Sequence, residues 1–331
     1  MALLEIRGLR TWFRTEAGML KAVDGVDLTL ERGETLALVG ESGSGKSVTA
    51  CSLLRLVEPA GGRIAGGEVL FRGTDLLRLD AAGIRAVRGD RIAMIFQEPL
   101  SALNPVQTIG AQIVEALRLH RRLSRRAAWK RAMELLALVQ IPSPHERARE
   151  FPHRLSGGMR QRAMIAMALA CEPELLIADE PTTALDVTTQ VQILALLRDL
   201  QRRLGMGLLL ITHDLGVVAE VADRVAVMYA GRVVEEGPVD RFFAAPAHPY
   251  ARGLLDAVRL EALAPGSRLP EIPGMVPSLV RRPPGCAFAP RCARVSPRCE
   301  EEDPVLRTEA DGCRHACFNP HRGDDAGQAA A

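Results

Sequence analysis

The first segments of the chain alternate apolar and polar residues and end at glycine. The runs LLEIRGL, VDLTLERG and GEVLFRG all follow this pattern. A period of two residues is typical of strands that bury one face and expose the other to water. The beginning of the chain is therefore predicted to form an antiparallel sheet that is partly exposed.

Four later segments are apolar without interruption, and helical stretches separate them. They are TLALVG (35–40), RIAMIF (91–96), ELLIAD (174–179) and GLLLIT (207–212). Continuous apolar runs of this length fit parallel strands that are covered on both faces. Strands that alternate with helices in this way predict an α/β core.

The middle of the chain is rich in helix-forming and basic residues, as in the stretch HRRLSRRAAWKRAMELL. We therefore expect a helical subdomain at about residues 98–165, inserted into the α/β core. Further along, MYAGRVVEEG (228–237) predicts a hairpin centred on Ala230 and Gly231.

The last part of the chain has a different composition. Six prolines lie between residues 259 and 284, and they predict an extended connector because proline disfavours helix at the residue before it. A cysteine-rich extension follows at 285–320, and the polar residues 321–331 are expected to be disordered. The α/β domain is expected to occupy residues 1–258.

Composition adds few constraints. The chain has 331 residues, of which 47% are apolar and 25% charged, and its formal net charge of +2 gives no argument for a nucleic-acid partner. It has no run of about eighteen apolar residues that could span a bilayer. The start, MALLEIRGLR, lacks the apolar core and cleavage site of a signal peptide. We therefore expect a cytoplasmic protein whose thiols are kept reduced.

A phosphate-binding loop is predicted at GESGSGKS (40–47), which matches G-x-x-x-x-G-K-[ST] between an apolar strand and a helical stretch. Gly43 and Gly45 would let backbone N–H groups surround phosphate oxygens. Lys46 would reach the β- and γ-phosphates, and the hydroxyl of Ser47 would bind Mg²⁺. A Gly/Ser-rich turn with an incidental lysine is the alternative, which the flanking strand and helix disfavour.

Two carboxylates follow the apolar strand in ELLIADEP (174–181). Asp179 suits the coordination shell of Mg²⁺, which takes few protein ligands and keeps waters. Glu180 lies one residue further, where a carboxylate could polarise an attacking water. The alternative is a strand whose acidic end faces solvent, and the phosphate-binding loop makes that alternative the weaker one.

Further polar residues are expected at the same edge of the sheet. In LSGGMRQR (155–162), Ser156 is a good N-cap, and Gly157 and Gly158 would allow a phosphate to approach the helix. Gln97 and His213 each follow an apolar strand, although a lone residue of either type is usually structural. Ligands of open parallel sheets gather beyond the carboxyl ends of the strands, so these residues are predicted to converge on one site.

This set of motifs resembles the ATP-binding cassette (ABC) family. GESGSGKS resembles its Walker A motif, LSGGM its signature, ELLIADE its Walker B motif, ALD (184–186) its D-loop and His213 its switch histidine. The resemblance implies that two cassettes pair head to tail, with ATP held between the loop of one and the signature of the other. It also implies an aromatic residue stacked on adenine, which is Phe13, with Trp12 as a rival.

The resemblance assigns a role to each of these residues. It implies that Glu180, His213 and Gln97 take part in hydrolysis and that Ser47, Gln97 and Asp179 hold Mg²⁺. The nucleotide contacts that it implies are Phe13, Gly40, Ser42, Gly43, Gly45, Lys46, Ser47, Val48, Gln97, Ser156, Gly157, Gly158 and Asp179.

Longer segments resemble the ATPase subunits of dipeptide and oligopeptide importers, among them FQEPLSALNP (96–105), ITHDLGVVAEVADRVAVMYAGRVVE (211–235) and HPYARGLL (248–255). Importers of nickel and glutathione are close relatives, so the cargo stays open. The resemblance implies a second cassette, usually a different chain, two transmembrane permease subunits and a periplasmic or extracellular substrate-binding protein. It places the chain at the cytoplasmic face of the inner membrane, with the permeases docked near residues 97–109.

Two other classes of protein share the predicted fold. A DNA-repair or chromosome ATPase would need long heptad coiled coils between the phosphate-binding loop and the signature, and no sustained heptads are present. A ribosome-associated cassette protein would carry two cassettes, whereas this chain has one phosphate-binding loop.

Five of the seven cysteines lie close to the end of the chain, at Cys286, Cys292, Cys299, Cys313 and Cys317. In a reducing compartment such clustering indicates a metal site. Structural zinc prefers C-x2-4-C pairs, which the first three cysteines lack, whereas an iron–sulfur cluster takes four thiolates without one required spacing. Reduced thiols packed as small apolar groups are the alternative to a metal.

The peptide-importer cassettes that the chain resembles carry a C-terminal cysteine motif of this type, which is associated with a [4Fe–4S] cluster. Matched residue by residue, the resemblance implies that Cys286, Cys292, Cys299 and Cys317 bind the cluster and that Cys313 is spare. Zinc remains the alternative metal. We expect a structural role, since metal binding can supply folding energy to a short Pro-rich segment, and a sensing role stays open.

Overall fold

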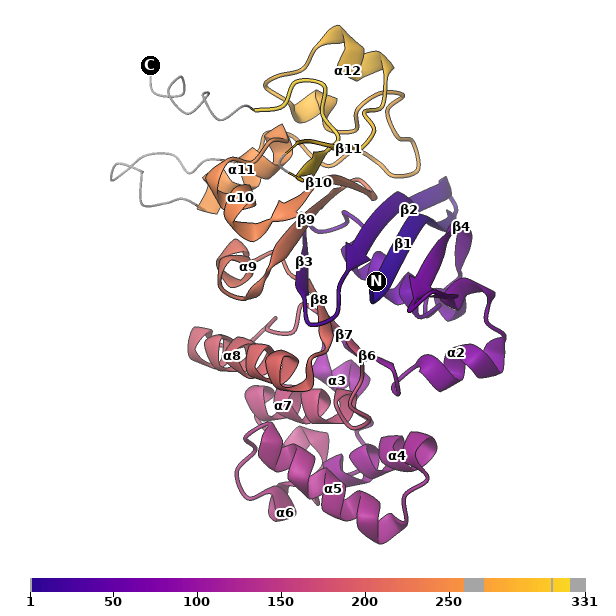
Figure 1. Ribbon diagram of the computed structural model, residues 1–331, viewed down its shortest axis with the longest axis vertical. Coiled ribbons are helices and arrows are strands. Elements are labelled where there is room, and N and C mark those ends of the chain that lie inside the picture. The colour runs from indigo at the N-terminus through magenta and orange to yellow at the C-terminus, as the bar shows by residue number, and fades with distance from the viewer. Residues whose placement is uncertain (1, 259–270, 311, 322–331) are drawn as a thin grey trace. The chain divides into compact units, whose positions relative to one another are not determined.

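The structure is a computed structural model that describes residues 2–258, 271–310 and 312–321 (Figure 1). Part of the predicted connector and nearly all of the predicted tail lie outside the described residues. The chain divides into two compact units. The first unit comprises Met1–Leu3, Leu30–Thr35 and Arg78–Ile211, and the second comprises Leu4–Thr29, Leu36–Leu77 and Thr212–Ala331.

The first unit contains three parallel strands. They are β6 (Ile92–Ile95), β7 (Leu175–Asp179) and β8 (Gly207–Ile211), with β7 in the middle. Every residue of β7 and β8 is buried. The uninterrupted apolar runs therefore predicted parallel, fully covered strands correctly.

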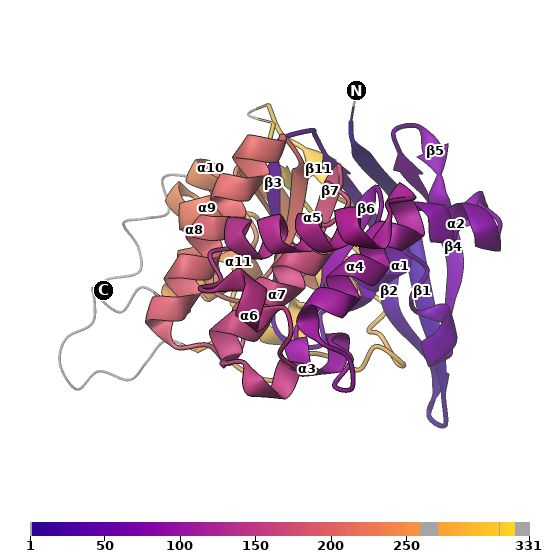
Figure 2. The same cartoon turned by 90° about the horizontal axis from the view of Figure 1, so that it is seen from below.

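Helices make up most of the first unit. After α2 (Ala81–Val87), five helices follow Gln97 where the helical subdomain is expected, and α4, α5 and α6 gather below α7 in Figure 1. Seen from below, α4 and α5 lie beside each other (Figure 2), as their mutual contacts require. The bounds are α3 (Pro99–Ala102), α4 (Ile109–Arg121), α5 (Arg125–Leu138), α6 (Pro144–Arg147), the short 3₁₀ turn η3 (Pro152–Arg154), α7 (Gly157–Ala168) and α8 (Val187–Leu204).

Side-chain caps define where these helices begin. Thr108 accepts a hydrogen bond from the backbone N–H of Ala111 at the start of α4, and Ser124 accepts one from Ala127 at the start of α5. Each cap satisfies one of the backbone donors that a helix leaves unpaired at its N-terminus.

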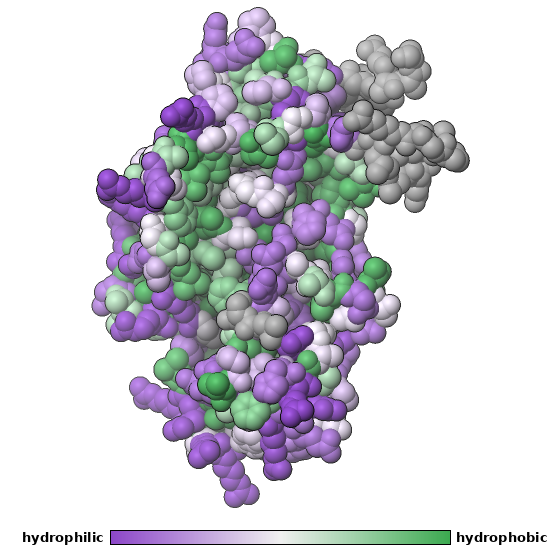
Figure 3. Space-filling view, turned by 180° about the vertical axis from the view of Figure 1, so that it is seen from behind, coloured by the Kyte–Doolittle hydropathy of each residue, from purple (hydrophilic) through white to green (hydrophobic). Residues whose placement is uncertain are grey.

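Hydrophilic side chains predominate around the helices at the bottom of the face drawn in Figure 3.

The second unit begins with an antiparallel sheet, as the alternating runs predict. Its strand order is β2 (Gly18–Leu30), β1 (Leu4–Thr15), β4 (Gly62–Phe71) and β5 (Thr74–Asp75). β1 and β4 run antiparallel with Leu4 opposite Phe71. Leu4 and Phe71 are both buried, whereas neighbouring residues on β1 are partly exposed.

The second unit also contains a mixed arrangement of five strands. In spatial order they are β3 (Thr35–Val39), β9 (Arg224–Tyr229), β10 (Arg232–Pro238), β12 (Arg314–His315) and β11 (Arg307–Thr308). β3 and β9 are parallel, and β9 and β10 form an antiparallel hairpin. Ala230 and Gly231 connect the two with φ values of 47° and 80°, the left-handed conformations that a two-residue hairpin turn requires. The predicted hairpin is thus confirmed.

The C-terminal part of the second unit packs into the same core as β3 and β9. Its helices are α9 (Leu215–Val221), α10 (Val239–Ala244), α11 (Pro249–Val258), the 3₁₀ turn η5 (Ala289–Arg291) and α12 (Pro297–Glu301), and α1 (Lys46–Leu53) precedes them in the chain. Tyr229, Tyr250 and Phe288 are buried together, with ring centroids 4.6 to 5.5 Å apart. These rings join residues that are far apart in the sequence. No helix in the described part of the chain is long and apolar enough to cross a membrane.

Candidate functional site

The phosphate-binding loop connects β3 to α1 and contains three glycines with positive φ. Gly40, Gly43 and Gly45 have φ values of 149°, 78° and 102°. A Cβ atom would lie 2.2 Å from the carbonyl oxygen of Met228 at Gly40 and 2.4 Å from that of Ala22 at Gly45. At Gly43 it would meet nothing within 4 Å. Gly40 and Gly45 are therefore required because a larger side chain would clash with the protein backbone. Of the three, only Gly43 faces open space.

Lys46 is the first residue of α1 and lies inside the loop. It is 6% exposed, and its ammonium group donates to the carbonyl oxygens of Gly40, at 2.7 Å, and Glu41, at 3.0 Å. Ser47 follows it and is half-buried. A cation and the N-terminus of a helix at one place favour the binding of phosphate. The loop thus combines a buried cation with the N-terminus of a helix.

In the first unit, Gln97 and Glu180 meet beyond the carboxyl ends of β6 and β7. The side-chain amide of Gln97 donates to Oε2 of Glu180 at 2.9 Å, and the hydroxyl of Thr183 donates to the same oxygen at 3.0 Å. The two donors orient the carboxylate. Asp179, the last residue of β7, is 5% exposed. Of the strand-end residues that are predicted to converge, Gln97 and Glu180 are therefore in contact within this unit.

Glu180 has a left-handed backbone conformation, with φ of 46°. Its N–H donates to the carbonyl oxygen of Ile211 at 2.9 Å, which fixes the residue next to the end of β8. A non-glycine residue in this conformation costs about 1–3 kcal/mol and is often found at functional sites. The sequence pattern gave no indication of this conformation.

The LSGGM segment forms the N-terminus of α7. Ser156 is the N-cap, and its hydroxyl accepts from the N–H of Met159 at 3.3 Å. A Cβ atom on Gly158 would lie 2.7 Å from Cγ2 of Thr189, whereas one on Gly157 would be 3.5 Å from its nearest neighbour. Gly158 is therefore required by packing against α8, a reason that the sequence could not show.

His213 and the two candidate adenine-binding aromatic residues belong to the second unit. His213 is exposed and lies just before Asp214, whose carboxylate caps α9 by accepting from the N–H groups of Gly216 and Val217. Trp12 and Phe13 are neighbours on β1, so their side chains point to opposite faces of the sheet. Only one of the two can stack on adenine.

The predicted residues fall into two sets, one in each unit. The phosphate-binding loop, Phe13 and His213 belong to the second unit, and Gln97, Asp179, Glu180 and the LSGGM segment to the first.

Four of the five C-terminal cysteines lie near one another. The pKa of Cys317 is raised to about 12, mainly by burial and to a smaller degree by the neighbouring Cys292, Cys286 and Cys299. The N–H of Cys286 also donates to the carbonyl oxygen of Cys299 at 2.8 Å. Cys313 lies elsewhere, because a Cβ atom on Gly237 would be 2.9 Å from its sulfur.

The grouping of these thiols does not by itself support the metal centre that the resemblance implies. Within residues 2–258, 271–310 and 312–321, no three His, Cys, Asp or Glu side chains are grouped so that they could hold a metal ion. Burial raises the pKa of Cys286, Cys292 and Cys317, which favours the neutral thiols when no metal is bound. Metal ligation requires thiolates.

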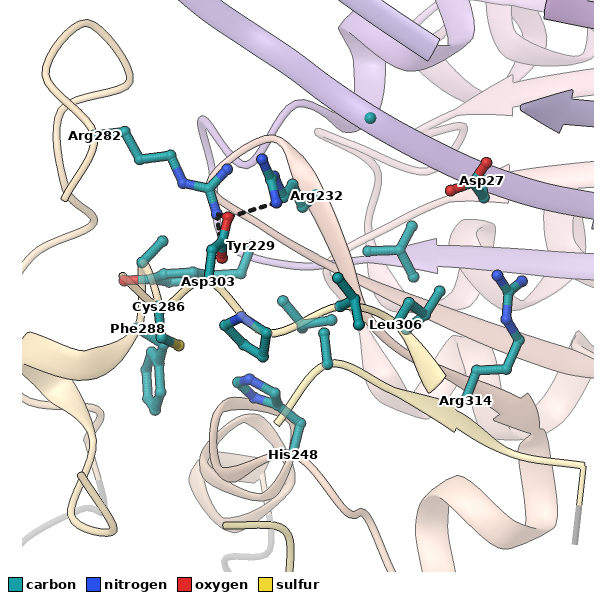
Figure 4. A pocket seen from close by; sticks show the side chains of 17 residues that line it. Asp27, Tyr229, Arg232, His248, Arg282, Cys286, Phe288, Asp303, Leu306 and Arg314 are labelled. Atoms are coloured by element: carbon teal, nitrogen blue, oxygen red, sulfur yellow. Dashed lines mark hydrogen bonds and ion pairs between the residues drawn. The ribbon is translucent and has the colours of Figure 1, made fainter. Parts of the chain in front are cut away.

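A cavity of about 230 Å³ in the second unit is lined in part by Cys286 (Figure 4). Arg232 and Arg282 both turn toward Asp303, with nitrogen–oxygen distances of 2.5 and 3.0 Å. Burial raises the pKa of Asp303, and the two arginines oppose that rise. His248 lies on the opposite wall of the cavity, and burial lowers its pKa to about 3, so it is a neutral hydrogen-bonding residue. The sequence predicted none of these contacts.

Two family profiles match the chain. One described as ABC transporter matches residues 23–183, and one described as oligopeptide/dipeptide transporter, C-terminal region, matches residues 234–299. A protein of Sinorhizobium fredii named as a peptide ABC transporter ATP-binding protein is 54% identical over 96% of this chain and 94% of its own length. A protein of Brucella melitensis named as a peptide import ATP-binding protein is 54% identical over 97% of this chain and 95% of its own length.

Solved structures have the same fold. The ATP-binding cassette MJ0796, in a dimeric post-hydrolysis state bound to ADP and Pi, is 29% identical with a TM-score of 0.65, over 71% of this chain and 98% of that one. The cassette cbiO1 of Clostridium perfringens is 28% identical with a TM-score of 0.63, over 73% of this chain and 91% of that one. Fold and site thus define a P-loop ATPase of the cassette type, as predicted. The chain belongs to the ABC transporter family and is an ATP-hydrolysing transport subunit that carries the oligopeptide/dipeptide transporter C-terminal region.

Proposed function

We propose that this chain is the ATPase subunit that powers the import of dipeptides or oligopeptides across the inner membrane. The observation that carries the proposal is the 54% identity, over nearly the whole chain, to proteins named for peptide import. The match to the oligopeptide/dipeptide C-terminal region at 234–299 lies outside the cassette match and supports the same cargo. Nickel and glutathione importers remain the alternative within the family.

The proposed chemistry is attack of water on the γ-phosphorus of ATP, with transfer of the water's proton to Glu180 and departure of ADP. Gln97 and Thr183 hold the Glu180 carboxylate in one orientation, which supports its role as the base. Lys46 would neutralise charge on the β- and γ-phosphates, and His213 would face the γ-phosphate. Mg²⁺, held by Ser47, Asp179 and Gln97, would neutralise the developing phosphate charge. The buried Asp179 and half-buried Ser47 are oxygen donors of the kind this ion prefers.

The proposed assembly contains two cassettes and two permeases. Ser156, Gly157 and Gly158 would contact the nucleotide of the second cassette, as the family resemblance implies, and the similar cassette MJ0796 is a dimer bound to ADP and Pi. The permeases would dock near residues 97–109, where Val106 is 78% exposed. The chain would then lie on the cytoplasmic face of the membrane, and a periplasmic or extracellular binding protein would deliver the cargo.

We further propose that the C-terminal cysteines bind a [4Fe–4S] cluster, with zinc as the alternative. The convergence of Cys286, Cys292, Cys299 and Cys317 supports these four as ligands and Cys313 as spare. The N–H of Arg294 donates to the sulfur of Cys292 at 3.3 Å, and the amide of Asn319 donates to that of Cys299 at 3.6 Å. Hydrogen bonds of this kind stabilise thiolate ligands. When bound, the cluster would supply cross-links that fold the segment, a structural role.

Co-purification tests the proposed assembly. The tagged chain should isolate two permease subunits and a second cassette from detergent-solubilised membranes, and a peptide-loaded binding protein should raise the ATPase rate of this complex. Stimulation by nickel or glutathione and not by peptides would select the alternative cargo. Co-isolation of ribosomes or DNA in place of permeases would contradict a transport role.

A further inference from the structure

A carboxylate within the phosphate-binding loop is held by an arginine from the C-terminal part of the chain. Glu41 is the second residue of the loop, and Arg291 ends the turn η5, between Cys286 and Cys292. Nη1 of Arg291 donates to Oε2 of Glu41 at 2.9 Å, and Nη2 donates to Oε1 at 3.2 Å. This two-bond geometry is the strongest form of an arginine–carboxylate pair. Both residues belong to the second unit.

Other contacts fix the guanidinium of Arg291 in place. Its Nε donates to the carbonyl oxygen of Pro273 at 2.8 Å, and Nη2 donates to that of Ile272 at 3.2 Å. The hydroxyl of Tyr229 lies 3.4 Å from Nη1. The side chain of Arg291 is 5% exposed and that of Glu41 is 28% exposed. A charge buried to this degree requires its partner, so removal of either residue leaves the other uncompensated.

The backbone of Glu41 is held from the same side. Its N–H donates to the hydroxyl oxygen of Tyr250 at 2.8 Å, and Tyr250 is fully buried against Tyr229 and Phe288. The carbonyl oxygen of Glu41 accepts from the ammonium group of Lys46 at 3.0 Å. One loop residue therefore connects the phosphate-binding lysine to the C-terminal aromatic core.

We propose that Arg291 is a positioning residue for ATP binding and that it acts through Glu41. Without the guanidinium, the loop would hold an unneutralised carboxylate near the place where the phosphates bind, and like charges at short range repel. The arginine also fixes the first half of the loop, so less conformational freedom is lost when the nucleotide binds. The C-terminal segment that includes Arg291 thereby becomes part of the ATP site. This inference rests on the ATPase function and is independent of the cargo and of any metal at the cysteines.

A double-mutant cycle on the full-length chain tests the proposal. The dissociation constant of ATP is measured with Mg²⁺ for the unmodified chain, Arg291→Met, Glu41→Gln and the double variant. We expect Arg291→Met to weaken ATP binding about tenfold in the unmodified chain but less than about twofold in the Glu41→Gln background. A residue that acted on folding alone would cause the same loss in both backgrounds. An equal loss of ATP affinity in the two backgrounds would overturn the proposal. Unchanged ATP affinity in a folded Arg291→Met protein would also overturn it.

Two further variants keep the test decisive. Arg298→Met is the matched control, because Arg298 lies in the same segment and pairs with the exposed Glu302; ATP affinity should stay within about twofold of the unmodified chain. If Arg291→Met does not fold, Arg291→Lys keeps a cation but loses the two-bond geometry. A loss of about threefold is then expected, again only when Glu41 is present. Equal losses with and without the Glu41 carboxylate would contradict the proposal.

Discussion

The side-chain amide of Gln97 donates a hydrogen bond to the carboxylate of Glu180 at 2.9 Å, across 83 residues of sequence. The contact joins the loop after β6 to the loop after β7. Together with the hydrogen bond from Thr183, it orients the Glu180 carboxylate. Gln97 also begins the segment where the permeases are proposed to dock. A displacement of that segment would therefore change the orientation of the proposed catalytic base.

Replacement of this base should separate binding from hydrolysis. In Glu180→Gln we expect ATP hydrolysis by the assembled complex to fall about 100-fold or more, while ATP affinity stays near that of the unmodified chain. The amide keeps the size of the side chain but cannot take a proton from water. Glu172→Gln is the control, since Glu172 is 61% exposed and pairs with Arg131 on the surface. Near-normal turnover in Glu180→Gln would remove Glu180 from the mechanism.

Loss of the loop lysine should act on binding instead. Lys46→Ala removes the cation that lies inside the loop, and we expect the dissociation constant of ATP to rise about tenfold or more. Titration with a fluorescent ATP analogue measures this change directly. Lys130→Ala on the exposed face of α5 should leave the constant unchanged. Equal affinities of the two variants would contradict the assignment of Lys46.

Two glycines of the same loop should respond differently to alanine. Gly45→Ala should lower the free energy of unfolding by about 2 kcal/mol or more, because its Cβ would lie 2.4 Å from the carbonyl oxygen of Ala22. Gly43→Ala should cost about 1 kcal/mol, the strain of a left-handed residue, because nothing lies within 4 Å of its Cβ. Urea unfolding of both variants measures the difference. A larger loss at Gly43 would contradict the packing described for the loop.

The proposed iron–sulfur cluster predicts different results for Cys313 and Cys317, which are close in the sequence. Protein purified without oxygen should contain about four iron and four sulfide per chain. Cys317→Ser should lose the iron, and its visible absorbance should disappear, whereas Cys313→Ser should keep both, because Cys313 packs against Gly237 and is not among the cysteines that act on Cys317. Colourless protein with one zinc per chain would show that the metal is zinc and not iron. Loss of iron in Cys313→Ser alone would show that Cys313, and not Cys317, is the fourth ligand.

Permease docking can be tested by site-directed crosslinking. Val106→Cys places a thiol at a side chain that is 78% exposed, and it should crosslink to a cytoplasmic loop of a permease in isolated membranes. Leu119→Cys, at the end of α4 in the same subdomain and 75% exposed, should not. Crosslinks from residue 119 and none from residue 106 would show that a different face of the subdomain meets the permease.

Local sequence patterns were sufficient to predict most of the fold. The parallel strands β7 and β8 and the turn at Ala230 and Gly231 depend on residues that are close in sequence, so their periodicity and glycine content were sufficient to predict them. The pairing of Glu41 with Arg291 could not be predicted, because it joins residues 250 positions apart through a core that exists only after folding. The packing requirement at Gly158 also depends on a distant residue, Thr189.

Peptide uptake by proteoliposomes tests the central claim most directly. The chain, its partner cassette and both permeases are reconstituted with internal ATP and supplied with the binding protein and a labelled tripeptide. We expect uptake that requires ATP, is abolished by Glu180→Gln and is inhibited by unlabelled peptides but not by nickel or glutathione. A complex that hydrolyses ATP yet accumulates no peptide, while it takes up nickel or glutathione, would contradict the proposed function.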